Sequence, residues 1–293
     1  MRSLLFVPGD SERKLEKGFS SEADVVIVDL EDSVSAQNKV SARVTAAGFL
    51  RAQQDKTGPA VYVRVNDLST GLTDDDLAAL VPACPAGIML PKSNSGADVQ
   101  RLSVKLRVLE AENGLPDGGI AILPIVTETA AGILAAGSYA GASPRLPGLT
   151  WGAEDLSAAI GARATRDERG RYTDVFRLAR AMTILGAAAA EVAAIDTVFP
   201  NFRDMDGFRR ECEEAERDGF TGKMAIHPAQ VPVINEVFTP SPAAVAHAQA
   251  VVSAFRAAGN PGVVALEGQM YDRPHLLRAE RLLARARAAG VAA

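Results

Sequence analysis

Eight short apolar runs, each followed by glycine, proline or polar residues, alternate with segments of helical periodicity along this 293-residue chain. The runs are residues 3–7, 24–28, 60–65, 87–90, 120–125, 149–151, 192–195 and 224–226. Several are apolar at every position, which is typical of parallel strands covered on both faces. Eight strand–helix units in one chain predict a closed TIM (β/α)8 barrel. The segment 174–190 is expected to form its longest helix.

The character of the chain changes after the eighth unit. Residues 239–242 read Thr-Pro-Ser-Pro, and two helical segments follow, at 243–258 and 274–289. Between them lies a segment, 263–272, that is first strand-like and then polar. We therefore expect a catalytic barrel of residues 1–238 and a C-terminal helical extension of residues 239–293, which is too small to be a catalytic domain of its own.

Composition excludes several classes of protein. The net charge is −5, which gives no basic footprint of the kind that nucleic-acid binders usually carry, so nucleic-acid binding is not expected. Cys84 and Cys212 are far apart and in no C-x-x-C context, which argues against a disulfide framework and a cysteine zinc site. No apolar run approaches the length of a membrane span, and the N-terminus does not resemble a signal peptide. These features predict a cytoplasmic protein.

Polar residues at the carboxyl ends of the strands are the candidates for chemistry, because that rim carries the active site of TIM barrels. Reading the eight ends in order gives Pro8 and Gly9, then Asp29, Glu31 and Asp32, then Arg64 and Asn66, Lys92, Glu128, Glu154 and Asp155, Asp196, and His227. Such a ring is rich in carboxylates and poor in histidine. It favours a hard cation, Mg²⁺ or Mn²⁺, over zinc.

Glu128 and Asp155 form the candidate metal site. They are 27 residues apart (155 − 128), which is about one strand–helix unit, so their strands are expected to be neighbours in the barrel. Two carboxylates leave several coordination positions of Mg²⁺ for water and a chelating substrate. The alternative is that each carboxylate only caps the helix that follows it. The sequence alone leaves both open.

Other rim residues surround this pair. Glu31 and Asp32 are candidates to hold metal-bound waters, whereas hydrogen bonds to Arg64 or Lys92 are the expected role of Asp29. Arg64 interrupts an apolar strand, and its guanidinium needs an anion. That anion is either a rim carboxylate or a carboxylate or enolate of the substrate.

Lys92 and His227 each have two interpretations. Lys92 at a strand end is the residue that a metal-free Schiff-base aldolase would use. The nearby carboxylates favour a protonated, paired ammonium instead. His227 is a general acid or base, or a hydrogen-bonded structural residue before a proline. His247 and His275 lie in helical surroundings with no evident partner.

Arg13 and Lys17 lie four residues apart on one face of the first expected helix, where they can meet phosphate groups or form a solvated surface pair with neighbouring glutamates. No glycine fingerprint of a P-loop or a dinucleotide-binding fold is present.

Taken together, these motifs resemble the citrate lyase beta subunit and malyl-CoA lyase family of CoA-ester lyases, within the HpcH/HpaI aldolase superfamily. The resemblance runs nearly end to end. Its motifs, in order, are Arg2-Ser-x-x-Phe-Val-Pro-Gly9, Asp29-Leu-Glu-Asp-Ser33, Val63-Arg-Val-Asn66, Met89-Leu-Pro-Lys92, Thr127-Glu-Thr129, Gly152-Ala-Glu-Asp-Leu156, Gly219-Phe-x-Gly-Lys-x-x-Ile-His-Pro228 and Glu267-Gly-x-Met-x-Asp272. Tyr271 departs from the pattern, because a small aliphatic residue is expected before the aspartate.

The resemblance implies specific roles. Glu128 and Asp155 would bind Mg²⁺, with Mn²⁺ as a substitute, and Arg64 would contact the substrate or its enolate. Pro8, Gly9 and the basic residues Arg13 and Lys17 would lie near coenzyme A. Asp272 would enter the active site of a neighbouring subunit and act as acid or base within a homotrimer or hexamer. The other possibility for Asp272 is that it caps the helix after it.

The implied reaction is the reversible aldol- or Claisen-type cleavage of a β-hydroxyacyl-CoA, such as citramalyl-CoA, malyl-CoA or a citryl thioester, to acetyl-CoA and a keto acid. Three alternatives remain at this point. They are a citrate lyase beta subunit that is active only with its partner subunits, a malyl-CoA thioesterase, and a CoA-independent aldolase of hydroxy-keto acids.

Overall fold

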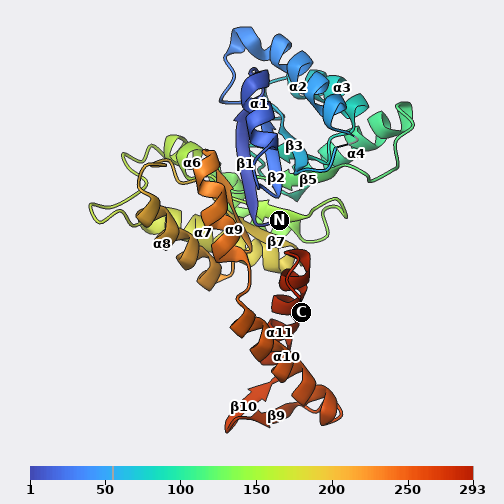
Figure 1. The fold of residues 1–293 in the computed structure, drawn as a ribbon. Coiled ribbons are helices and arrows are strands. Elements are labelled where there is room, and N and C mark those ends of the chain that lie inside the picture. Colours follow the sequence, from blue (N-terminus) through green and yellow to red (C-terminus); the bar gives the residue numbers. More distant parts are fainter. Residues whose placement is uncertain (55, 293) are drawn as a thin grey trace. The chain divides into compact units, whose positions relative to one another are not determined.

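The computed structural model describes residues 1–54 and 56–292, and it contains the expected barrel (Figure 1). Its eight parallel strands are β1 Ser3–Pro8, β2 Val25–Asp29, β3 Ala60–Arg64, β4 Gly87–Leu90, β5 Ala121–Pro124, β6 Gly148–Thr150, β7 Ala193–Asp196 and β8 Gly222–Ala225. Their order is β5-β4-β3-β2-β1-β8-β7-β6. A parallel bridge between Ile125 and Thr150 joins β5 to β6, which brings the two ends of the sheet together. The TIM-barrel prediction is confirmed.

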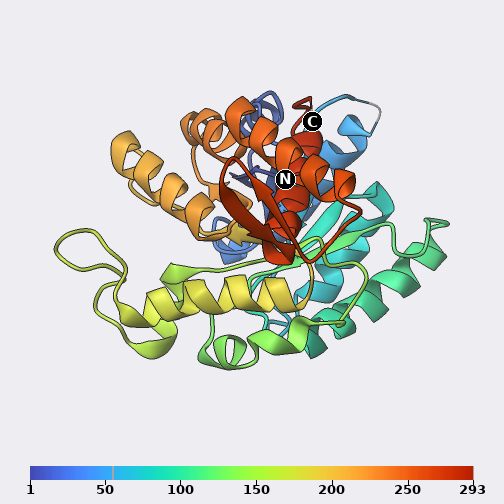
Figure 2. The same ribbon diagram turned by 90° about the horizontal axis from the view of Figure 1, so that it is seen from below.

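Helices surround the strands of the barrel (Figure 2). They are α1 Glu12–Phe19, α2 Lys39–Gln53, α3 Thr73–Leu80, α4 Gly96–Glu112, α5 Ala130–Leu134, α6 Ala153–Ile160, α7 Asp174–Ala189, α8 Met205–Asp218 and α9 Val231–Phe238. The expectation that 174–190 forms the longest of them is wrong, because α7 has 16 residues and α4 has 17. Ser95 caps α4, and after Gly96 at its first position no glycine or proline interrupts the chain before Gly114.

The interior of the barrel explains which polar residues reach the rim. An apolar cluster of nine buried residues fills it, among them Leu4, Ile27 and Tyr62. Side chains two positions apart on a strand point to the same face. Asp29 therefore follows Ile27 on the inward face of β2, and Arg64 follows Tyr62 on that of β3. Both are delivered to the carboxyl end of the interior.

A buried polar network holds β6, β7 and β8 against α8. The indole N–H of Trp151 donates to Asp196 Oδ1 at 2.7 Å, and Lys223 Nζ lies 2.6 Å from Asp196 Oδ2 and 2.8 Å from Glu211 Oε1. Asp196 thus turns outward to the helical layer and does not join the ring of rim carboxylates. Because Trp151 directly follows β6, this network helps to fix the strand end that Asp155 follows.

The residues after the barrel form a second compact unit, Asn235–Ala293. It contains α10 Pro242–Ala257, a hairpin of β9 Val263–Leu266 and β10 Gln269–Asp272, and α11 Arg273–Ala288. Phe255, Val264 and Leu276 belong to its small apolar core. The hairpin reverses at Glu267 and Gly268, which both have positive φ, 52° and 77°.

Across the described ranges, no helix is long and apolar enough to cross a membrane.

The buried network predicts a large effect of replacing Lys223, whose side chain is fully buried. We expect Lys223→Met to lower the free energy of unfolding by about 3–5 kcal/mol, because Asp196 and Glu211 lose the cation that offsets their burial. Urea titration followed by the fluorescence of Trp151, the single tryptophan, measures this.

Lys105→Met is the matched control. Lys105 Nζ lies 2.6 Å from Asp74 Oδ1, but the Asp74 side chain is 70% exposed, so the loss is expected to stay below about 1 kcal/mol. Equal effects of the two substitutions would contradict the structural role of the network.

Candidate active site

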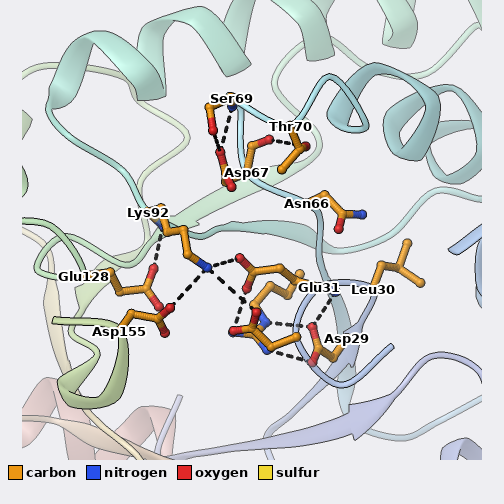
Figure 3. Close-up of polar contacts among 12 residues, drawn as sticks. Asp29, Leu30, Glu31, Asn66, Asp67, Ser69, Thr70, Lys92, Glu128 and Asp155 are labelled. Atoms are coloured by element: carbon orange, nitrogen blue, oxygen red, sulfur yellow. Dashed lines mark hydrogen bonds and ion pairs between the residues drawn. The ribbon is translucent and has the colours of Figure 1, made fainter. Parts of the chain in front are cut away.

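The carboxyl ends of the barrel strands surround a cavity of about 220 Å³. Apolar side chains such as Phe6 and Val198 line part of it, and its charged lining residues are Asp29, Asp32, Arg64, Glu128, Glu154 and Asp155. These charged residues come from the ends of four different strands, β2, β3, β5 and β6, as the positional argument from the sequence predicted. Figure 3 shows the polar contacts on this side of the barrel.

Glu128 and Asp155 lie beside each other in Figure 3, which confirms that their strand ends are neighbours. Neither carboxylate is the cap of its helix. Thr129 caps α5, and its hydroxyl accepts a hydrogen bond from the N–H of Gly132 at 3.0 Å. The N-cap of α6 is Gly152, which has no side chain to offer. The helix-capping alternative therefore does not account for this pair.

Glu128 is a buried carboxylate with few polar partners to offset the cost of its burial. Only 3% of the residue is exposed, and the backbone N–H of Lys92 donates to its Oε2 at 2.5 Å. Burial, and next the negative charge of Asp155, raise the pKa of Glu128 to about 8. A cation between the two carboxylates would remove this repulsion.

The donor set fits a hard divalent cation. Within residues 1–54 and 56–292, no group of three or more His, Cys, Asp or Glu side chains is arranged to hold a metal, so this site offers two carboxylates. Mg²⁺ is commonly held in this way, with water and substrate oxygens completing the octahedron. Glu128 and Asp155 are therefore the residues of this cavity that suit Mg²⁺.

Gly152 is a part of the site that the sequence did not reveal as such. A Cβ atom at this position would lie 2.9 Å from Glu128 Cγ and 3.1 Å from its Oε1. Real Cβ atoms essentially never lie as close as the first distance, and the second is tighter than nine in ten real Cβ contacts. The absence of a side chain at Gly152 is thus what leaves room for the Glu128 carboxylate. The only sequence signal was a glycine between a strand end and an acidic turn.

Arg64 is held by two rim carboxylates. Its Nε and Nη2 each donate to Asp29 at 2.7 Å in a bidentate pair, and its Nη1 lies 2.9 Å from Glu31 Oε2. Burial would raise the pKa of Asp29, but the hydrogen bonds and charge of Arg64, together with hydrogen bonds from Ser33 and from the N–H of Glu31, outweigh it and lower the pKa. The guanidinium also lies 4.9 Å from the centre of the Phe6 ring. The expected role of Asp29 is confirmed by these contacts.

Lys92 links the two halves of the site. Its ammonium contacts Glu31 Oε1 and lies 3.2 Å from Asp155 Oδ1, and its backbone has a positive φ of 51°. Burial would lower the pKa of Lys92, but the hydrogen bond and charge of Glu31, with the charge of Asp155, raise it instead. An ammonium that stays protonated is a poor Schiff-base nucleophile, so the ion-pair interpretation is favoured.

The other predicted binding residues differ in their exposure to solvent and in their partners. Asp32 is more than half exposed, and its Oδ2 lies 3.6 Å from Arg64 Nη1. Gly9 is buried, and its N–H donates to the carbonyl of Asp29 at 2.8 Å. Arg13 and Lys17 are exposed on α1, and Pro8 at the end of β1 is partly exposed. Because α1 follows β1 directly, its N-terminal end lies on the carboxyl side of the barrel.

His227 has a structural role in the barrel. Its Nδ1 accepts a hydrogen bond from the N–H of Ala229 at 3.2 Å, and its ring stacks on that of Phe202 at 5.0 Å. The side chain thus caps the short helix Pro228–Gln230. Of the two interpretations of His227, these contacts support the structural one.

Asp272 belongs to the C-terminal unit, where it ends β10 and is the N-cap of α11. The helix-capping interpretation is therefore observed, which does not exclude a second role. His247 and His275, for which the sequence showed no evident partner, both have one in the structure. His275 contacts the Asp272 carboxylate, and His247 Nε2 lies 3.2 Å from the hydroxyl of Tyr271. The capping-box spacing from Asp272 to His275 was the available signal.

A larger depression, of about 1540 Å³, lies along α7, α8 and the loop before α7. Seven arginines and seven carboxylates line it, so its formal charge is balanced. Glu154, which has an exposed side chain, lines both this depression and the cavity at the strand ends, whereas Glu128 and Asp155 line only that cavity.

Comparisons with known proteins agree with this geometry. The chain is 35% identical over 291 residues to a (3S)-malyl-CoA thioesterase of Cereibacter sphaeroides, covering 98% of this chain and 95% of the relative. It is 35% identical over 286 residues to the citrate lyase subunit beta of Leuconostoc mesenteroides subsp. cremoris, covering 96% and 92%.

A solved structure is also similar along nearly its whole length. The CitE protein of Mycobacterium tuberculosis, in complex with magnesium, acetoacetate and coenzyme A, matches with a TM-score of 0.77 and 34% identity, covering 97% of both chains. Residues 2–228 match the family model described as HpcH/HpaI aldolase/citrate lyase. This chain therefore belongs to the HpcH/HpaI aldolase/citrate lyase family.

Proposed function

We propose that this protein is a Mg²⁺-dependent carbon–carbon lyase that cleaves a carboxylate-bearing β-hydroxyacyl-CoA to acetyl-CoA and a keto acid such as glyoxylate, pyruvate or oxaloacetate. The observation that carries the proposal is the buried Glu128 carboxylate beside Asp155, in a cavity that also holds Arg64. Similar chains named for citrate lyase and malyl-CoA chemistry, and a CitE complex with magnesium and coenzyme A, support it.

Glu128 and Asp155 would hold the metal, and the N–H of Lys92 would orient Glu128. When bound, Mg²⁺ acts as a Lewis acid toward the hydroxyl and carboxylate of the substrate, or toward the keto acid in the condensation direction. The ion pairs of Lys92 with Glu31 and Asp155 would keep the rim carboxylates in place.

Arg64 would stabilise the negative charge that develops on the acetyl-CoA enolate when the carbon–carbon bond breaks. Asp29 accepts hydrogen bonds from two of its nitrogens, so the guanidinium is oriented before the substrate binds. Such preorganisation is what makes electrostatic stabilisation effective in an enzyme site.

Asp272 would transfer the proton to or from the enolate carbon, in the active site of a neighbouring subunit. This role requires a homo-oligomer, for which we propose a trimer or hexamer. Exposed Arg13 and Lys17 would meet the phosphates of coenzyme A, near Pro8 and Gly9.

Thioester hydrolysis of malyl-CoA is the second candidate, because a relative of that name covers almost the whole chain. One experiment separates the candidates. The isolated protein is incubated with Mg²⁺ and citramalyl-CoA or malyl-CoA, with and without EDTA. Free keto acid and acetyl-CoA support the lyase, whereas free CoA with the intact hydroxy acid supports the thioesterase. Cleavage that appears only with added citrate lyase subunits would overturn the stand-alone enzyme.

The metal site predicts unequal effects of changing the two adjacent acids. We expect Asp155→Asn and Glu128→Gln each to lower kcat/KM by more than about 100-fold, because each removes a metal ligand. Glu154→Gln changes an acid that lines the same cavity but has an exposed side chain and no proposed contact with the metal, so it is expected to change kcat/KM by less than about tenfold. Wild-type turnover in Asp155→Asn would refute the assignment of the metal ligands.

The close approach of Gly152 to Glu128 gives an independent test of the same site. Gly152→Ala would push the Glu128 carboxylate away, so we expect Mg²⁺ to bind about tenfold more weakly in calorimetric titrations of the EDTA-treated protein. Gly48→Ala is the control, because a Cβ there meets no atom within 4 Å. Unchanged Mg²⁺ affinity in Gly152→Ala would show that Glu128 does not bind the metal.

A further inference from the structure

Thr197 directly follows β7 and faces the interior of the barrel. Ile195 belongs to the apolar cluster inside the barrel, whereas the next residue, Asp196, pairs with Lys223 on the side of the helices. Side chains alternate between the two faces of a strand, so Thr197 returns to the face of Ile195. In agreement with this, Thr197 lines the cavity at the strand ends. Thr197 therefore ends the inward face of β7 as Arg64 ends that of β3.

The hydroxyl of Thr197 has no hydrogen-bond partner in the described part of the chain. Only 1% of the residue is exposed, and its Oγ1 atom is buried and unpaired. Such a group is unusual, because an unmade hydrogen bond leaves the cost of removing the hydroxyl from water uncompensated. Two nearby threonines differ, since Thr150 Oγ1 lies 3.6 Å from Met224 Sδ and Thr127 Oγ1 accepts a hydrogen bond from the N–H of Gly152 at 3.3 Å. A molecule bound in the cavity would supply the partner that Thr197 lacks.

The side chains that line the cavity offer few hydrogen-bond donors to a substrate. Five of them are carboxylates, namely Asp29, Asp32, Glu128, Glu154 and Asp155. An ionised carboxylate only accepts hydrogen bonds, and the apolar lining residues do neither. Of the described residues around the cavity, Arg64 and Thr197 are those whose side chains can donate. Because a substrate carboxylate is itself an acceptor, these two donors are the side chains of the lining that can hydrogen-bond to it.

Arg64 and Thr197 lie on opposite sides of the strands that precede the metal-binding pair. In the barrel, β3 is two strands away from β5, whereas β7 is next to β6 on the other side. The acetyl-CoA enolate is proposed to lie near Arg64, so the keto acid part of the substrate is left with the side of β7. The other lining residues on this side, Val198 and Met224, are apolar. Thr197 is therefore the residue on this side whose side chain can recognise a carboxylate.

We infer that Thr197 is a binding residue for the keto acid part of the substrate, and that its hydroxyl donates a hydrogen bond to the carboxylate of that part. The inference rests on the proposed lyase function. Rotation about χ1 turns the hydroxyl from the wall of the barrel into the cavity, with no movement of the backbone. In the free protein this hydroxyl has no partner to lose, and in the complex it gains a charged one. The new hydrogen bond therefore favours binding in full.

Direct binding of a keto acid tests the inference without turnover. The probes are pyruvate and glyoxylate, each titrated calorimetrically into the full-length protein in the presence of Mg²⁺. We expect Thr197→Val to bind them about tenfold more weakly than the wild type, because valine has a similar shape but no hydroxyl. Thr197→Ser keeps the hydroxyl and should stay within about threefold of the wild-type affinity. Equal affinities of the wild type and Thr197→Val would overturn the inference.

The stability of the free protein separates ligand binding from a structural role of the hydroxyl. An unpaired buried hydroxyl does not stabilise the fold, so Thr197→Val should not lower the urea midpoint of unfolding. A lower midpoint with unchanged keto acid affinity would show a structural role and overturn the inference. Thr183→Val is the control, because it removes a buried hydroxyl that donates to the carbonyl of Ala179 at 3.0 Å, within α7. This variant should keep the wild-type affinity for both keto acids.

Kinetics in the condensation direction give a second measurement. In Thr197→Val we expect the KM for the keto acid to rise about tenfold and kcat to change by less than about threefold, because the hydrogen bond is present in the bound substrate and in the transition state alike. Failure of the proposed function would look different. A wild-type protein that binds neither keto acid with Mg²⁺ would refute the lyase and this inference together. Wild-type binding that is equally tight in Thr197→Val would refute the role of Thr197 alone.

Discussion

The site depends on one electrostatic constraint, which is that β5 and β6 deliver two carboxylates to the same side of a small cavity. Glu128 is almost completely buried, and Asp155 adds to the cost of ionising it. Proteins do not keep such a pair without positive charge nearby. Here the ammonium of Lys92 lies beside Asp155, and a divalent cation is the group that would satisfy both acids. The rest of the rim is arranged around this need for positive charge.

Charges of opposite sign alternate around the rim. Asp29 and Glu31 both form ion pairs with Arg64. Glu31 also forms an ion pair with Lys92, whose ammonium lies beside Asp155. Each group is held by a neighbour of opposite charge. On the outer side of the barrel, Asp196 pairs with Lys223 and accepts a hydrogen bond from Trp151, which directly follows β6 and precedes the acidic turn. The network of Asp29, Arg64, Glu31 and Lys92 faces the cavity, whereas the network of Asp196 and Lys223 faces the surrounding helices.

Much of the fold could be predicted from the sequence, since apolar runs and the spacing of strand–helix units depend on local pattern. All eight strands lie within about two residues of the runs that predicted them, and the 27-residue spacing correctly placed Glu128 beside Asp155. The features that could not be predicted depend on the direction of a side chain or on contacts between residues far apart in the sequence. Asp196 turns outward because of its pairing with Lys223, and the partner of His275 is found only once α11 starts at Arg273. The closeness of Gly152 to Glu128 is likewise a matter of tenths of an ångström.

The length of the hairpin formed by β9 and β10 determines the position and direction of Asp272 in the C-terminal unit. Its tight turn at Glu267 and Gly268 fixes where β10 begins, and Asp272 is the fourth and last residue of that strand. Because successive strand residues point to opposite faces, the distance from the turn to Asp272 decides which way the carboxylate points. The length of this strand can therefore change only in steps of two residues if Asp272 is to keep its direction. The length of this hairpin is thus constrained by the direction of one carboxylate, in addition to the packing of Val264, Leu266 and Tyr271 in the core of the unit.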